Sequence, residues 1–390
     1  MLDAITSIER TGREPKGVMQ DVLNLVMQDL RTDFSRRSEY FRTLLSVVIV
    51  LFCAFPMMVA VLLTILASMM VLPLAIAFTF VSIMMSAGYI ALIDAQVPKL
   101  ADYTVVYKRI LIRCLPLSIS FVATLYFLAN VPIIRFITSY KALIFLLASL
   151  FFVVPGYIEF KREARVVDEI LEMLPNVIRD LADEIHRGSP PAIALERISE
   201  SHSYGEWMDR LISLLIRRLR ITGSLKEALR GLEPLLPEPM KVALGLMIVS
   251  EEYGARPESY HMLADILNEY MLSIREFKRG NQMYRWVSLS MVFLSVVLVF
   301  VLFKTVVTRI AMAGEVISVS PTPVPISIIT PEEIPAIRDW IYLMIAVNSS
   351  SLALAMGKTL DWRVGGGFRD LILVCIFIIV ILIIDLLPIL

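Results

Sequence analysis

The sequence predicts an all-α membrane protein that carries one helical module in water. The 390 residues have a mean hydropathy of +0.73. Residues 43–93 contain no charge in 51 positions, whereas residues 159–285 hold 18 Lys/Arg and 21 Asp/Glu in 127 positions. Long uncharged runs match the hydrocarbon core of a bilayer, and a densely charged block requires water.

The apolar segments predict about seven transmembrane helices, because a helix needs about 20 apolar residues to cross a bilayer. The predicted spans are 43–67, 70–93, 114–134, 139–158, 286–307, 337–356 and 369–388. The first uncharged run is too long for one span, and Leu72–Pro73 near its middle predicts a tight hairpin turn.

Four regions follow from this pattern. They are a cytoplasmic N-terminal helical segment at 1–42, four transmembrane helices in 43–158, a cytoplasmic helical module at 159–285, and three transmembrane helices in 286–390. The last region includes an extracytoplasmic Pro-rich loop at 308–336. Residues 1–42 are charged throughout, which is not typical of a signal peptide.

The distribution of Lys and Arg predicts the orientation in the membrane. Residues 1–42 hold seven cations and the loop 94–113 holds four, whereas the acidic loop 308–336 holds only Arg309. We therefore expect the N-terminus and the module on the cytoplasmic side of the cell membrane and the C-terminus on the other side.

Helical periodicity predicts that the module is a bundle of about six helices. Two apolar stripes follow steps of three and four residues, as in helices that pack on a partner. The first is Val167, Leu171, Leu174, Ile178, Leu181 and Ile185, and the second is Tyr260, Leu263, Leu267, Tyr270, Ile274 and Phe277. Shorter helices are expected near 190–200, 204–222, 225–235 and 239–253.

Glycine and proline mark the expected helix ends and a hinge. Gly188, Gly223 and Gly254 each follow an amphipathic segment and are predicted to close its helix. Pro155 and Gly156 separate the fourth span from the first module helix and could form a bend. By contrast, 258–307 predicts one long helix that enters the membrane, a geometry suited to passing motion from the module into the membrane.

One basic cluster in the module is a candidate binding surface. By helical geometry Arg210, Arg217 and Arg220 share a face opposite the apolar side of the 204–222 helix, and Arg218 flanks it. Two interpretations remain open: a solvated face with acidic neighbours, or a docking surface for an acidic cytoplasmic protein.

The sequence offers no recognisable catalytic or cofactor-binding pattern. Met356–Thr359 resembles the end of a phosphate-binding loop, but the required glycine at position 352 is Leu352. The three histidines and three cysteines lack metal-site spacing, and a net charge of zero gives no reason to expect nucleic acid. We therefore expect a protein that is not an enzyme and holds no cofactor or metal.

Four groups of residues resemble the type II secretion F-domain family. They are Glu172–Ala182 with Gly188-Ser189 and Ala194-Leu195, Thr222–Leu229, Glu251–Gly254 with Leu263-Ala264, and a tail with Gly357-Lys358, Gly365–Gly367 and Leu371. The tail is similar to that of archaeal archaellum and type IV pilus platform proteins. Many members carry two F domains and this chain has one, as do members of tight-adherence systems.

The resemblance implies a non-enzymatic integral membrane platform at the base of a type IV pilus-like filament. Such a platform docks a hexameric cytoplasmic ATPase and couples its motion to pilin-like subunits entering or leaving the membrane. A second platform protein or a homodimer, and membrane lipid, are further expected partners. The clustering of basic residues on the predicted cytoplasmic face adds the expectation that seven cations help to dock the ATPase. They are Arg210, Arg217, Arg218, Arg220, Lys358, Arg363 and Arg369.

Two other classes of protein compete with the platform. A membrane scaffold or receptor would share its architecture without transmitting force. A transporter would place ionisable residues or broken helices within the spans, and the sequence shows few such residues and none central.

Overall fold

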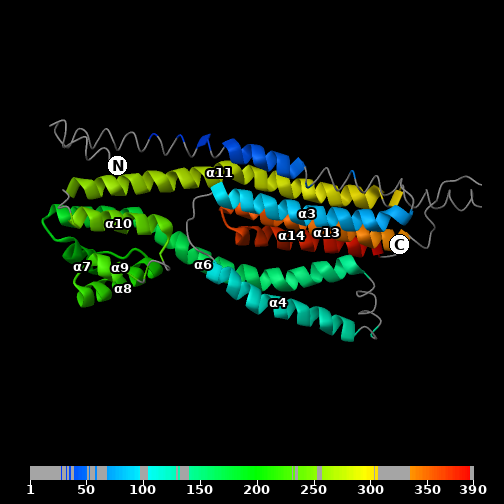
Figure 1. Cartoon of the computed structure of the whole chain (residues 1–390), viewed down its shortest axis with the longest axis horizontal. Coiled ribbons are helices and arrows are strands. Elements are labelled where there is room, and N and C mark those ends of the chain that lie inside the picture. Colours follow the sequence, from blue (N-terminus) through cyan, green and yellow to red (C-terminus); the bar gives the residue numbers. More distant parts are fainter. Residues whose placement is uncertain are drawn as a thin grey trace, which may run out of the picture. The chain divides into compact units, whose positions relative to one another are not determined.

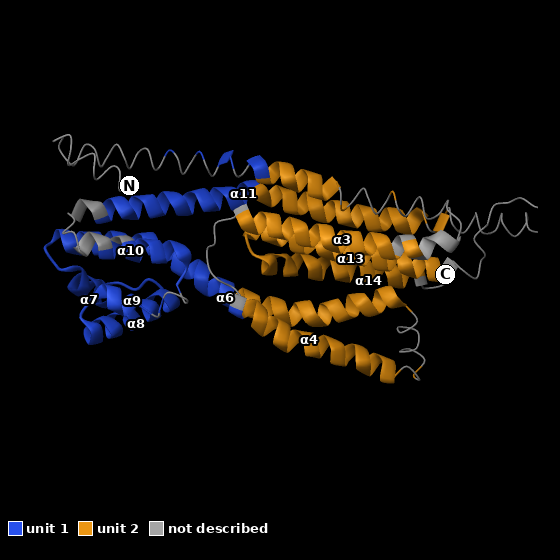
Figure 2. Ribbon diagram, viewed as in Figure 1, with its two compact units in different colours: residues 1–40, 98–105, 162–280 blue, residues 41–97, 106–161, 281–390 orange. Residues whose placement is uncertain are grey.

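The described part of the computed structural model is helical throughout, apart from turns, and contains no strand. It covers residues 28, 32, 35–36, 39–50, 52, 58, 68–96, 104–128, 131, 140–230, 232, 236–252, 257–302, 304–305 and 334–386. Figure 2 divides the chain into two compact units. Unit 1 comprises residues 1–40, 98–105 and 162–280, and unit 2 comprises 41–97, 106–161 and 281–390.

The helices follow the predicted order along the chain (Figure 1). They are α3 (Ser68–Gln96), α4 (Thr104–Phe127), α6 (Lys141–His186), α7 (Pro191–Ser201), α8 (Glu206–Thr222), α9 (Leu225–Leu229), α10 (Glu238–Glu252), α11 (Pro257–Leu302), α13 (Ile334–Asp361), the 3-10 helix η3 (Val364–Gly367) and α14 (Phe368–Leu386). Helices α6 and α11 each contribute residues to both units.

Unit 1 is built around one apolar core. The core contains buried side chains from the second half of α6, from α7 to α10 and from the first half of α11. The two predicted stripes supply much of it, with Leu174, Ile178 and Leu181 on α6 and Tyr260 and Leu267 on α11. Because these residues recur every three or four positions, one face of each helix is apolar and turns inward.

Ion pairs between α6 and α11 lie along the edge of this core. Arg275 Nη2 lies 3.1 Å from Glu172 Oε1, and Arg179 Nη2 lies 3.4 Å from Asp265 Oδ1. His261 on α11 lies 3.5 Å from Asp183 on α6. The stripes and these pairs show that the two long helices are partners within the chain.

Helix α13 is the central helix of unit 2. It packs against α3, η3 and α14, and most of its apolar length is buried. Its polar side chains bind neighbours: Thr359 Oγ1 lies 3.0 Å from Tyr89 Oη, and Asn348 donates to the carbonyl of Phe52. Helix α3 reaches the same surface through Ser86, which donates to the Ser351 carbonyl at 3.2 Å.

Asp339 of α13 closes the first turn of α6. Its two carboxylate oxygens accept hydrogen bonds from the backbone N–H groups of Lys141 and Ala142, at 3.0 and 3.1 Å. The first N–H groups of a helix have no partner inside it, and a carboxylate there also interacts favourably with the helix dipole. Asp339 is thus a helix cap supplied from a distant part of the chain.

The structure confirms the predicted fold class. Six of the helices in the described ranges are long and apolar enough to cross a membrane: α3, α4, α6, α11, α13 and the η3–α14 segment. The first predicted span, 43–67, lies mostly outside the described residues, so the expected total of seven stays a prediction.

Two local predictions differ from the structure. Pro73 lies inside α3, so the turn predicted at Leu72–Pro73 is wrong. Proline lacks an N–H group and so removes one backbone hydrogen bond of α3, a loss that is tolerated in membrane helices. In addition, Pro155 and Gly156 do not separate two helices, because α6 runs through both.

Gly156 has a packing role within unit 2. A Cβ atom at this position would lie 3.2 Å from Ile110 Cγ2 and 3.5 Å from Phe368 Cε2. The glycine therefore allows side chains of α4 and α14 to approach α6 closely. A hinge at Pro155–Gly156 stays a prediction.

Candidate functional site

Helix α8 carries the predicted basic cluster, and its sequence fixes which face turns outward. The inner face contains Met208, Ile212, Leu215, Ile216 and Leu219. All five are buried in the core of unit 1. The arginines therefore lie on or beside the opposite side of the helix, as the periodicity predicts.

Glycine follows the last turn of α8 and that of α6. Gly223 has φ of 70°, and its N–H donates to the Leu219 carbonyl at 2.8 Å. Gly188, which follows α6, has φ of 91°. Only glycine adopts this left-handed conformation without steric cost. The third predicted cap, Gly254, lies outside the described residues.

The start of α8 is anchored to α6. Glu169 Oε1 accepts the Trp207 N–H at 2.9 Å, although the two residues are 38 positions apart. Gly205 has φ of 106°, and a Cβ atom there would lie 2.6 Å from Glu169 Oε1. The backbone conformation therefore favours glycine at position 205, and a larger residue would also displace the Glu169 carboxylate.

A second set of bonds fixes the loop before α8. Asp209 accepts hydrogen bonds from the Tyr204 N–H at 2.8 Å and from Ser203 Oγ at 2.7 Å. The Tyr204 hydroxyl donates to Asp180 Oδ2 on α6 at 2.6 Å. Burial and this bond to a carboxylate raise the pKa of Tyr204 well above its ordinary value. As a result, α8 is held in one orientation at its first turn.

Three of the four α8 arginines have partners within unit 1. Arg210 Nη2 lies 2.6 Å from Glu206 Oε1, and its guanidinium lies over the Trp207 ring at 4.9 Å. Arg220 Nε donates to Glu196 Oε1 of α7 at 2.8 Å, and this carboxylate raises the pKa of Arg220.

Arg218 and Arg217 differ in whether their guanidinium groups are bonded to the described residues. Arg218 donates to the carbonyls of Arg230 and Ala228, at 3.1 and 3.4 Å, and so closes the end of α9. Arg217 is exposed, and its guanidinium makes no hydrogen bond or ion pair with the described residues. Among the predicted docking arginines of α8, Arg217 is the one whose charge has no partner among the described residues of unit 1.

The three predicted docking cations of the C-terminal region lie in unit 2 and are held inside it to different degrees. Lys358 forms an ion pair with Asp94, and only 13% of its side chain is exposed. Arg363 is 5% exposed. Arg369 is half exposed, and its Nε lies 3.6 Å from Asp370 Oδ1. Burial disfavours Lys358 and Arg363 as contacts for a partner, whereas Arg369 remains accessible.

A buried ion network lies nearby and was not predicted. Arg285 of α11 bonds to Asp361 Oδ2 at 2.5 Å and to Asp370 Oδ2 at 2.8 Å. Its Nη2 also lies 3.4 Å from the carbonyl of Gly366. The side chains of Arg285 and Asp370 are 13% and 2% exposed. Four elements, α11, α13, η3 and α14, thus meet at one guanidinium.

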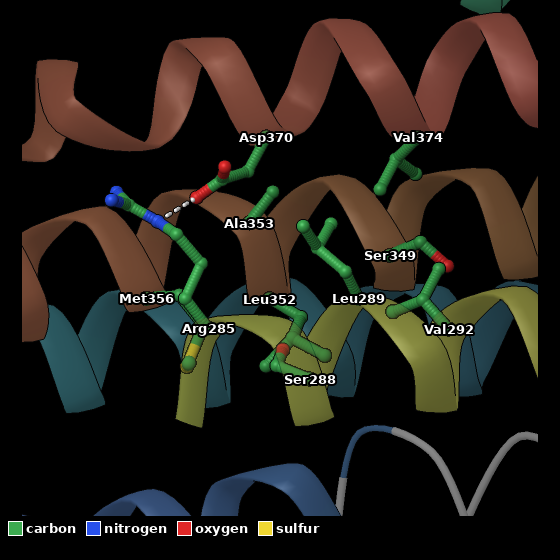
Figure 3. Close-up of a pocket in the computed structure, with 10 residues that line it drawn as sticks. All are labelled: Arg285, Ser288, Leu289, Val292, Ser349, Leu352, Ala353, Met356, Asp370 and Val374. Carbon is green, nitrogen blue, oxygen red and sulfur yellow. Dashed lines mark hydrogen bonds and ion pairs between the residues drawn. The ribbon is translucent and has the colours of Figure 1, made fainter. Parts of the chain in front are cut away.

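A small cavity adjoins this network (Figure 3). Its lining residues are Arg285, Ser288, Leu289, Val292, Ser349, Leu352, Ala353, Met356, Asp370 and Val374. It measures about 10 Å³, which is room for about one water molecule. Asp370 Oδ1 is buried and accepts no hydrogen bond from the described residues.

Glycines allow the loop beside the network to pack closely. A Cβ atom on Gly365 would overlap the ring of Phe160, and one on Gly367 would overlap the carbonyl of Ala353. A Cβ atom on Gly357 would overlap the backbone of Gly367. The glycine-rich tail pattern therefore has a packing explanation.

The sequence contained a weak signal for this network. Arg285 directly precedes the predicted fifth span, and Asp361 and Asp370 flank the Gly365–Gly367 segment. Charges at the ends of apolar segments are ordinary, so only the tertiary structure shows that these three converge. Among the described residues, no group of three His, Cys, Asp or Glu side chains could hold a metal ion.

Fold and surface together define a polytopic membrane protein with a compact helical module. Comparison with known families is more specific: the model for type II secretion system protein F matches residues 177–307. This range begins within α6, contains α7 to α10 and includes all of α11. The match confirms the resemblance to the F-domain family over about a third of the chain. No curated protein and no solved structure matches the chain.

Proposed function

We propose that this chain is the integral membrane platform of a type II secretion or type IV pilus-like machine. The observation that carries the proposal is the F domain at 177–307 in a chain with six helices long enough to cross a membrane. In this role the protein docks a cytoplasmic assembly ATPase and couples its motion to pilin-like subunits in the membrane. It is a mechanical component and not an enzyme.

The distribution of cations supports a definite orientation. Positive residues concentrate in 1–42, in 94–113 and around the loop 357–368, and the acidic loop 308–336 has one. By the positive-inside rule, unit 1 faces the cytoplasm and the C-terminus lies on the opposite side. The ATPase therefore meets unit 1, and the accessible arginines of α8, together with Arg369, are the docking candidates.

Helix α11 supplies a covalent route for coupling. It runs from Pro257 to Leu302 and contains both part of the unit 1 core and one of the apolar segments. A continuous helix resists bending because each turn is hydrogen-bonded to the next. We propose that α11 conveys displacement of the module to the membrane-embedded residues.

The direct test is binding of the full-length chain in lipid nanodiscs to the secretion-type ATPase from the same genome. Saturable binding that weakens with added salt is expected, because charge attraction between exposed groups is screened. Absence of binding in every nucleotide state would contradict the platform role and favour a membrane scaffold. A matched control is a nanodisc without the chain.

Orientation can be tested separately by thiol labelling. In a chain whose native cysteines are replaced, a single cysteine at Ser213 in α8 should react with an impermeant reagent only from the cytoplasmic side. A cysteine at Ser320 should react only from the other side. Labelling of both positions from one side would overturn the proposed topology.

A further inference from the structure

The outward side of α8 combines charge and apolar surface in a regular pattern. Arg210, Leu214, Arg217 and Ile221 follow one another at steps of four, three and four residues. At 100° per residue these four side chains fall within an arc of about 60°, and they extend about 16 Å along the helix. We call this set the α8 stripe.

The apolar members of the stripe are unusually accessible. Leu214 is 43% exposed and Ile221 is 80% exposed, the largest value for a large apolar side chain among the described residues of unit 1. A single exposed apolar residue is common on a protein surface. Two on one stripe, alternating with arginines, form a surface whose burial would be favourable.

The charged members show where a partner would contribute most. Arg210 already has Glu206 beside it, whereas Arg217 lies between the two apolar residues and has no described partner. A carboxylate brought to Arg217 would therefore form an ion pair without breaking any ion pair between described residues. Arg220 lies on the flank of the stripe and is already bonded to Glu196, so a carboxylate of a partner would gain less binding energy there.

A membrane surface is the less favoured occupant. Helices that bind lipid interfaces present a broad apolar face to the bilayer. The broad apolar face of α8 is used in the core of unit 1, and only Leu214 and Ile221 remain on the stripe. A narrow row that alternates charge with apolar contact fits another helix better, because helix side chains meet a partner at the same three- and four-residue spacing.

We infer that the α8 stripe docks an amphipathic helix of the assembly ATPase that alternates acidic and apolar residues at helical spacing. The inference rests on the proposed function and names the contact within it. In this contact an acidic side chain bonds to Arg217, and apolar side chains cover Leu214 and Ile221. The bonds from Glu169 and Asp209 hold α8 in place before the partner arrives, which lowers the ordering cost of binding.

The test compares matched variants of the full chain in zwitterionic nanodiscs for binding to the purified ATPase. R217E is expected to weaken binding about tenfold, since it removes an attraction and adds a repulsion. The double variant L214S/I221S is expected to weaken it by a similar factor, because central apolar contacts dominate interface energies. R217K keeps the charge and should lose less than about threefold.

Controls alter exposed residues that do not belong to the stripe. V242S changes an exposed apolar side chain of α10, and R230E reverses an exposed charge near α9. Both are expected to bind within about twofold of the unchanged chain. A photo-crosslinking residue at position 214 should capture the ATPase, and one at position 242 should not.

The outcomes separate this inference from the proposed function. If the unchanged chain binds the ATPase and the stripe variants bind equally well, the stripe inference is overturned and the platform function stands. If the unchanged chain does not bind, both fail. If the stripe variants lose binding to anionic vesicles but keep the ATPase, the stripe is a lipid contact and the inference is overturned.

Discussion

The α6–α11 ion pairs of unit 1 and the Arg285 network of unit 2 lie in opposite surroundings. In unit 1, the pairs between α6 and α11 are exposed, with side chains of Arg179 and Asp265 49% and 56% accessible. In unit 2, Arg285 and Asp370 are almost completely enclosed. Exposed pairs contribute little to stability, whereas removing one member of a buried pair leaves an uncompensated charge.

This difference reflects what drives each unit to fold. Unit 1 is stabilised by burying the apolar side chains of its core away from water. Its charged side chains therefore need only remain solvated. Helices in lipid gain little from burying apolar surface, because the lipid is equally apolar. Unit 2 therefore depends more on small residues, close packing and specific polar contacts such as Asn348 and Thr359.

The largest expected effect comes from removing the central cation of unit 2. R285A leaves Asp361 and Asp370 without their shared partner and should destabilise unit 2 by about 3–5 kcal/mol. Cys375 is fully buried in this unit, so thermal unfolding in detergent can be followed by its reaction with a thiol probe. The control R275A breaks an exposed pair of unit 1 and should cost less than about 1 kcal/mol. Equal losses of stability in R285A and R275A would contradict the proposed difference between the buried and the exposed ion pairs.

A smaller effect is expected from filling the close contact in the loop before α14. G367A forces a methyl group against the Ala353 carbonyl and should cost about 1–3 kcal/mol. Gly88 of α3 is the matched control, since nothing lies within 4 Å of an added Cβ there. G88A should leave the same thiol-protection midpoint unchanged or slightly raised. A similar loss from both changes would show that packing at Gly367 is not special.

The cap of α6 gives the next test. D339N removes the negative charge and one acceptor from the start of the helix and should cost about 1–2 kcal/mol. Hydrogen exchange of the first turn of α6, near Lys141 and Ala142, should rise in the variant. The exposed change E276Q serves as a control, and no increase in exchange over E276Q would argue against the cap.

The smallest effect concerns the hydroxyl of Tyr204 in unit 1. Y204F loses the bond to Asp180 and should cost about 1 kcal/mol at pH 7. Because the folded-state pKa is raised above 10.0, the bond contributes fully below that pH, and its contribution is lost as the unfolded state ionises above it. Pulse proteolysis should therefore show a steeper fall in stability above pH 10 for the unchanged chain than for Y204F. Parallel curves of stability against pH for the two proteins would exclude this role of the Tyr204 hydroxyl.

Sequence periodicity predicted the parts of the fold that depend on local pattern. The stripes of α6 and α11, the inward face of α8 and the glycine ends at Gly188 and Gly223 all follow from spacing and from backbone preference. Turn positions within an apolar run were harder to predict, because a proline such as Pro73 is tolerated inside a helix of membrane type. The continuous helix through Pro155 could not be distinguished from two helices by composition alone.

The candidate site was predictable in outline and not in its selection of residues. Helical geometry grouped Arg210, Arg217 and Arg220. In the structure Arg210 pairs with Glu206, and Arg220 pairs with Glu196 of another helix. The burial of Arg363 and the convergence on Arg285 depend on contacts between distant segments. No local pattern encodes which charge is enclosed and which stays accessible.

The cap of α6 has a consequence for how the chain matures during synthesis. Lys141 and Ala142 emerge from the ribosome almost 200 residues before Asp339, which accepts their N–H bonds. Until α13 is made, the leading end of α6 must take other partners for these groups, such as water or lipid headgroups. Unit 2 therefore reaches its final hydrogen bonding only after its later helices enter, and a chain truncated before Asp339 would carry a permanently unfinished α6.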